Sequence, residues 1–156
     1  MSPATLDHAG IATLIPHRGP MCLLDRMISW SETRIECVAV NHRDPGHPLR
    51  SASGLLASAA IEYAAQAMAL HGALCAAAGG DRASPGFLAS ARDVRLACKR
   101  LDDLPRTGGD ELVVVAERQA ADAARLLYSF VLRHDGRELA SGRVAVVLDA
   151  ALAHAR

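Results

Sequence analysis

The sequence lacks several features that mark particular classes of protein. It has no excess charge of either sign, because 17 basic residues balance 17 acidic ones among its 156. This balance gives no reason to expect a nucleic acid or a membrane surface as partner. It has no apolar run of the roughly 20 residues that a membrane-spanning helix needs, and no basic-then-apolar signal segment near its start. We therefore expect one cytoplasmic domain over residues 1–156, with no nucleic-acid or membrane partner.

Cysteine is sparse, and its spacing excludes two further classes. The four cysteines, none of them in a C-x-x-C pair, are Cys22, Cys37, Cys75 and Cys98. Their spacing supports neither a zinc site nor a disulfide framework. Because all four lie in apolar runs, we expect buried, reduced thiols.

What the sequence contains is an ordered series of strand-like and helical segments. The expected elements are a short helix at 5–14, strands at 21–30 and 34–40, a loop at 41–54, a helix at 55–78, and strands at 86–98, 111–119, 124–134 and 137–149. A hairpin signal, HDG at 134–136, joins the last two strands. A helix that is apolar nearly all round needs burial on every side. We therefore predict an α+β fold in which a curved antiparallel sheet of about six strands wraps a long central helix, and a second subunit covers the remainder.

Two polar residues interrupt this apolar helix, in SAAIEYAAQAMALHG at 58–72. Glu62 and Gln66 are four residues apart, so they share one face of the helix, with alanines around them. Apolar surroundings raise the pKa of a carboxyl group by desolvation. Such a group can exchange a proton near neutral pH, as general acid–base catalysis requires. The alternatives are that Glu62 lies on a solvated stripe or pairs with an arginine.

Three stretches carry a resemblance to a known family. They are LIPHRGPMCLLDRMISW at 14–30, IEYAAQAMALHG at 61–72 and HDGRELASGRVAVV at 134–147. They resemble, in this order, the leading P-H-R…L-L-D-R segment, the helical acid with a glutamine four residues later, and the closing hairpin and strand of the hot-dog-fold 3-hydroxyacyl-(acyl-carrier-protein) dehydratases. The resemblance extends from about residue 14 to residue 148.

The loop before the helix departs from the fatty-acid enzymes of this family. Those enzymes place their catalytic histidine in a G-H-F-P-G loop, at the position where this chain has Pro48, and His47 is one residue out of register. The segments PHRGPM at 16–21 and PLR at 48–50 are more similar to the dehydratases of aryl polyene gene clusters, which generally lack the loop histidine. On this resemblance His17 is the available base, and His47 is the second candidate.

The resemblance implies a reaction and a set of roles. A 3-hydroxyacyl thioester on acyl carrier protein would lose water to give a trans-2-enoyl thioester, in aryl polyene or related fatty acid or polyketide synthesis, with no metal or organic cofactor. His17 would remove a C2 proton, and Glu62 would protonate the departing C3 hydroxyl. The substrate-binding residues would be Ala57, Ser58 and Gln66, with free N–H groups of the first helical turn binding the thioester oxygen. In this family the acid and the histidine come from different subunits, which implies a homodimer or a heterodimer with a related dehydratase.

Two other functions stay open. A hot-dog thioesterase could use Glu62 to activate water, and it would release a free thiol. A non-catalytic partner subunit, which binds acyl chains or completes the dimer of another dehydratase, would explain the missing loop histidine. Four of the other histidines receive no role: we expect His42 at the surface, while His8, His134 and His154 lie in terminal or turn segments.

Overall fold

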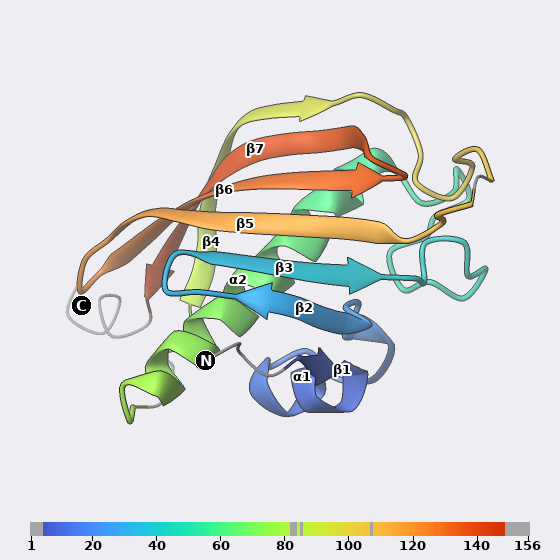
Figure 1. Cartoon of the computed structure of the whole chain (residues 1–156). Coiled ribbons are helices and arrows are strands. Elements are labelled where there is room, and N and C mark those ends of the chain that lie inside the picture. The colour runs from blue at the N-terminus through green and yellow to red at the C-terminus, as the bar shows by residue number, and fades with distance from the viewer. Residues whose placement is uncertain (1–4, 82–83, 85, 107, 149–156) are drawn as a thin grey trace.

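One antiparallel sheet of seven strands curves around one long helix in the computed structural model, which describes residues 5–81, 84, 86–106 and 108–148 (Figure 1). The elements in chain order are β1 (Leu6–Asp7), α1 (His8–Leu14), the 3-10 helix η1 (Gly19–Met21), β2 (Arg26–Trp30), β3 (Arg34–Ala39), the 3-10 helix η2 (Ala57–Ala59), α2 (Ala60–Ala78), β4 (Gly86–Leu96), β5 (Leu112–Ala121), β6 (Arg125–His134) and β7 (Arg137–Leu148). The predicted α+β architecture is confirmed, and the seventh strand is the two-residue β1.

The sheet has the strand order β1-β2-β3-β5-β6-β7-β4, with antiparallel pairing throughout. The predicted hairpin joins β6 to β7, and Asp135 and Gly136 have φ values of 50° and 76° there. Positive φ at both central residues is what a two-residue type I′ turn requires. After α2 the chain returns as β4 at the far edge of the sheet, against β7. The predicted end of the last strand, residue 149, lies outside the described residues.

Helix α2 packs one face against the sheet and leaves the other partly open. Its buried face includes Tyr63, Ala67 and Leu70, which belong to the same apolar core as Tyr128 and Phe130 of β6. The alanines favour helix formation, and the helix ends at Gly79 as predicted. None of the described helices combines the length and the hydropathy that crossing a bilayer requires.

The predicted strand at 21–30 begins later than expected, at Arg26. The reason is a side chain that occupies the backbone groups of its first residues. The amide of Gln66 donates to the carbonyl of Met21 at 2.7 Å and accepts the N–H of Leu23 at 2.8 Å. These residues therefore bond to α2 instead of pairing with a neighbouring strand.

The start of α2 is held by the segment that follows β4. The N–H of Ala57 donates to the carbonyl of Lys99 at 2.9 Å. Gly54, with a φ of +93°, lies so close to Arg100 that a Cβ would come within 2.5 Å of the guanidinium. Arg100 is fixed in turn by two hydrogen bonds to the carboxylate of Asp102, of 2.9 and 2.8 Å. The entrance to the helix is thus anchored by both backbone and side chains.

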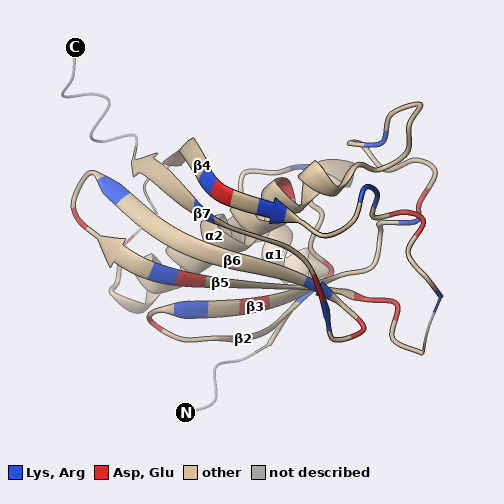
Figure 2. Ribbon diagram, turned by 90° about the horizontal axis from the view of Figure 1, so that it is seen from above, with Lys and Arg blue, Asp and Glu red and all other residues tan. Residues whose placement is uncertain are grey.

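Charges of opposite sign neighbour one another on β3 and β5. On β3 and β5, basic and acidic positions lie side by side (Figure 2). Arg34 lies 3.3 Å from Glu36 and 3.7 Å from Glu117, its partner in the strand register. This arrangement fits the balanced charge of the sequence.

All four cysteines are free, as predicted. Cys22 and Cys37 are buried, whereas Cys75 and Cys98 are only partly buried. Burial raises the pKa of Cys37 to about 12, so this thiol stays protonated and unreactive at neutral pH.

Candidate active site

The loop before β2 meets one face of α2 close to its start. His17 lies in this loop between α1 and η1, and Glu62 lies in the first turn of α2. Nε2 of His17 is 3.2 Å from Oε1 of Glu62. The two side chains are 24% and 34% exposed, so both can be reached from solvent. The structure therefore brings the predicted base and acid together within one chain, whereas the resemblance implies a pair formed across two subunits.

Gln66 joins this pair to the loop. Its Nε2 donates both to Oε1 of Glu62, at 3.0 Å, and to the carbonyl of Met21, while its Oε1 accepts the N–H of Leu23. The side chain has no exposed surface. These bonds fix the carboxylate of Glu62 and tie the loop that carries His17 to the helix. They give Gln66 a positioning role; its predicted contact with substrate stays a prediction.

The loop itself is restrained on both sides of His17. Pro16 precedes it, and Gly19, with a φ of +54°, opens the short helix η1. Within the described part of the chain, Nδ1 of His17 is buried and has no hydrogen-bond partner. Nε2 is thus the ring nitrogen that faces the acid and the solvent.

His47 belongs to a different group of side chains. Its Nδ1 accepts the N–H of Leu49 at 3.1 Å, which leaves Nε2 to donate to the hydroxyl of Tyr63 at 2.9 Å. That hydroxyl donates to Oδ1 of Asn41 at 2.7 Å. Burial lowers the pKa of His47. Because Tyr63 is one residue beyond Glu62, the two side chains leave α2 about 100° apart, so the contacts of His47 turn it toward a different face of the helix.

The two predicted backbone donors of the first turn differ in availability. The N–H of Ala57 is engaged with Lys99, because this segment pairs with the chain after β4. Ser58 is exposed and occupies the second position of η2, where a 3-10 turn offers no internal acceptor for the N–H. Of the two, Ser58 therefore presents the donor that a ligand can use.

One group of side chains was missed from the sequence. His42 was expected at the surface but is only 1% exposed, and it lies beside Asp110 and His134. The polar sequence NHRD concealed this burial, since its arginine and aspartate suggested solvent. His154, also left without a role, lies outside the described residues.

Solved structures share this fold. The dehydratase heterocomplex ApeI:P from Xenorhabdus doucetiae has a chain that superposes with a TM-score of 0.78 at 23% identity, over 93% of this chain and 95% of the other. A thioesterase from Haemophilus influenzae gives a TM-score of 0.61 at 13% identity over 99% of both chains. A hypothetical thioesterase from Streptococcus pneumoniae, solved with coenzyme A, gives 0.55 at 10% identity over 78% and 83%. None of the curated proteins matches the chain.

The antiparallel sheet wrapped around one long central helix is the fold that these structures share, and it places the chain among the hot-dog-fold proteins. A family model identifies the chain more narrowly than the fold does. The chain belongs to the ApeP-like dehydratase family, whose model, described as ApeP dehydratase, matches residues 9–155. The resemblance to the aryl polyene branch of the hot-dog dehydratases is thereby confirmed.

Proposed function

We propose that this chain catalyses the loss of water from 3-hydroxyacyl thioesters on acyl carrier protein, giving trans-2-enoyl thioesters in aryl polyene or related fatty acid or polyketide synthesis. The observation that carries the proposal is the 3.2 Å contact between Nε2 of His17 and Oε1 of Glu62, in a chain of the ApeP-like dehydratase family. An acid and a base that touch beside a helix N-terminus suit an elimination, which needs both.

The pair supplies both an acid and a base when Nε2 of His17 and the carboxylate of Glu62 share one proton between them. With that proton on Glu62, Nε2 of His17 has a free lone pair and takes a proton from C2 of the substrate. The electrons of the broken C2–H bond form the C2–C3 double bond, and the C3 hydroxyl leaves as water with the proton of Glu62. His17 is then protonated and Glu62 ionised. Transfer of one proton across their contact restores the starting state.

Negative charge develops on the thioester oxygen while the C2 proton is removed. Ser58 is an exposed residue at the start of η2, and its N–H is the donor that we assign to this oxygen. The N-terminal end of the 19-residue helix α2 adds its partial positive charge nearby. Ala57 is buried and its N–H is engaged with Lys99, so it offers no second donor.

A second subunit also belongs to the proposal. The edge strand β4 is exposed along nearly its whole length, including Phe87, Leu88 and Leu96, which are 53%, 44% and 44% exposed. A long apolar edge strand is a ready site for pairing with another chain. We propose that a second copy or a related dehydratase pairs here, as a homodimer or a heterodimer; the similar structure from Xenorhabdus doucetiae is a heterocomplex.

The test follows the mass of the acyl group on a 3-hydroxyacyl carrier-protein thioester, with the full chain alone and with a related dehydratase added. We expect loss of one water and an intact thioester. Release of a free thiol would instead assign the chain to the thioesterases, whose fold it shares. If water is lost only with the added partner and at the same rate when Glu62 is replaced by Gln, the chain is a non-catalytic subunit.

We expect Gln66→Leu to lower kcat by up to about 100-fold, the cost of misplacing a reacting group by about 1 Å, and to leave KM nearly unchanged. The substitution removes the bond that orients Glu62. It also leaves the N–H of Leu23 and the carbonyl of Met21 without their partner, at about 1–3 kcal/mol for each group. Steady-state kinetics and thermal unfolding measure the two effects.

A matched control separates positioning from stability. Leu70→Ala also destabilises α2, by about 2–5 kcal/mol if it resembles other buried leucines, but Leu70 has no part in the amide network. We expect kcat per folded molecule to stay normal in this variant. A Gln66→Leu variant that changes KM and not kcat would instead indicate the substrate contact predicted from the sequence.

A further inference from the structure

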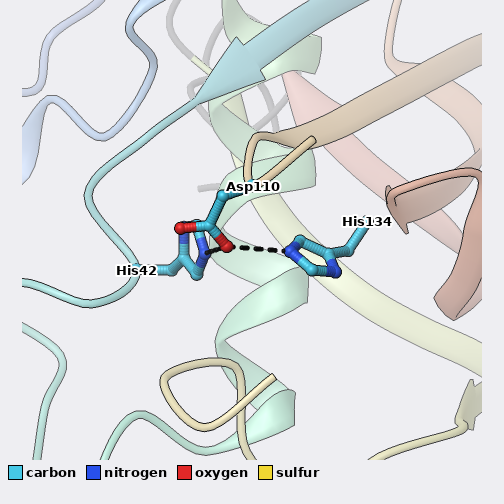
Figure 3. A group of neighbouring side chains, drawn as sticks. All are labelled: His42, Asp110 and His134. Carbon is cyan, nitrogen blue, oxygen red and sulfur yellow. Dashed lines mark hydrogen bonds and ion pairs between the residues drawn. The ribbon is translucent and has the colours of Figure 1, made fainter. Parts of the chain in front are cut away.

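Three side chains that the proposed reaction does not use converge at one end of three neighbouring interior strands. His42 follows β3, Asp110 precedes β5, and His134 ends β6 (Figure 3). The strand register explains the convergence, because Leu112 pairs with Ala39 on one side and with His134 on the other. Residues far apart in the sequence are thus held together by neighbouring strand ends.

The distances within this group suit a bound cation. Oδ1 of Asp110 lies 3.0 Å from Nε2 of His134 and 3.4 Å from Nε2 of His42. One ligand atom from each residue lies within 4.8 Å of the others. A tetrahedral ion with bonds of about 2.0–2.2 Å separates its ligand atoms by roughly 3.3–3.6 Å. Small side-chain rotations would bring all three atoms to that spacing.

His42 provides an independent observation. It is 1% exposed, and neither ring nitrogen has a hydrogen-bond partner within the part of the chain that the structure describes. Figure 3 shows its ring turned toward Asp110, although the 3.4 Å approach is not a hydrogen bond. An unpaired polar group in the interior is costly. A metal ion bound to Nε2 of His42 would give this nitrogen a partner.

We propose that His42, Asp110 and His134 bind a divalent transition-metal ion of the zinc class. Two imidazoles and one carboxylate are a donor set that Zn²⁺ and Co²⁺ accept, with a fourth position left for water. The strand ends supply the ligands, so the ion would hold the adjoining ends of β3, β5 and β6 together. It would also fix the start of the loop that leads to α2, and its role is structural, separate from the chemistry of His17 and Glu62.

Arg43 affects the affinity that we expect of this site for a metal ion. Its guanidinium contacts both oxygens of Asp110, with Nη2 at 2.6 Å from Oδ1 and Nε at 2.8 and 3.1 Å from Oδ2 and Oδ1. It orients the carboxylate as an outer-shell partner does in metal sites. Its positive charge opposes a cation, so we expect weaker binding than at a structural zinc site with four protein ligands.

The test titrates Co²⁺ into the full chain after dialysis against a chelator. We expect one Co²⁺ per chain with the visible absorption of a nitrogen-ligated ion, its displacement by Zn²⁺, and a Zn²⁺-dependent rise in the unfolding temperature. Loss of an outer-shell partner alone weakens metal binding by about 10- to 100-fold. His42→Gln and His134→Gln each remove a direct ligand, so each should weaken binding by at least this factor. The exposed His8, replaced by Gln, is the control and should bind normally.

Two results would overturn the proposal. One is a folded wild-type chain that binds neither ion. The other is unchanged affinity in both histidine variants with native circular dichroism, which would place bound metal elsewhere. If His42→Gln does not fold, His134→Gln and the wild-type titration decide the question, because His134 ends a strand and is not enclosed in the loop.

Discussion

The Glu62→Gln variant is expected to lose water elimination by about 10²- to 10⁴-fold, the usual contribution of one positioned acid or base. Glutamine matches glutamate in shape and can still bond to His17 and Gln66, which contact the carboxylate at 3.2 and 3.0 Å. It cannot deliver a proton to the leaving hydroxyl. The rate of enoyl thioester formation by the full chain, with a partner dehydratase present where one is needed, measures the loss.

Glu117→Gln is the matched control for this substitution. Glu117 is exposed and, like Glu62, contacts a nitrogen-bearing side chain, in this case the guanidinium of Arg34 on the sheet. We expect the wild-type rate in this variant, because it changes the net charge by the same amount away from the site. Wild-type activity in Glu62→Gln would remove Glu62 from the mechanism and favour the non-catalytic subunit.

His17→Gln is expected to reduce the same reaction by a similar factor, again about 10²- to 10⁴-fold. The amide can keep a hydrogen bond to Glu62 but has no lone pair basic enough to take the C2 proton. The loop should keep its conformation, since Gly19 and the bonds from Gln66 to Met21 and Leu23 restrain it independently of the imidazole. Single-turnover measurement of the enoyl product isolates the chemical step from substrate binding.

His47→Gln distinguishes the two bases that the sequence proposed. His47 bonds to Tyr63 and Leu49 inside the chain, so we expect a lower unfolding temperature with near-normal activity of the folded protein. The opposite pattern, activity lost in His47→Gln and kept in His17→Gln, would move the base to His47. It would require a rearrangement that brings the loop to Glu62.

Local sequence patterns predicted the elements that local chemistry determines. The alanine-rich segment formed α2 and ended at Gly79, and Asp135-Gly136 formed the two-residue hairpin. The shared face of Glu62 and Gln66 follows directly from helix geometry, and their side chains are in contact. Each of these features depends on residues close together in the chain.

Features that depend on distant residues were not predictable in the same way. The roles of His17 and Glu62 came from a family resemblance, which placed the acid and the base on different subunits. Their contact within one chain was not predicted, because no rule of spacing connects a loop to a helix so far along the chain. The late start of β2 depends on Gln66. The N–H of Ala57 is occupied because Lys99, beyond α2 and β4, pairs with it. In each case a residue remote in the sequence bonds to a group for which the local sequence pattern shows no partner.

If His17 and Glu62 act as proposed, the acid and the base on one chain make each subunit of an assembly chemically self-sufficient. A dimer with one inactivated subunit would keep half of its sites, and two subunits inactivated at different residues would not repair each other by mixing. In a site divided between subunits, such mixing rebuilds one working copy. On the proposed mechanism, the contact between His17 and Glu62 therefore places both catalytic groups on a single polypeptide. A partner subunit would then affect the shape of the site and the access to it without supplying a catalytic residue.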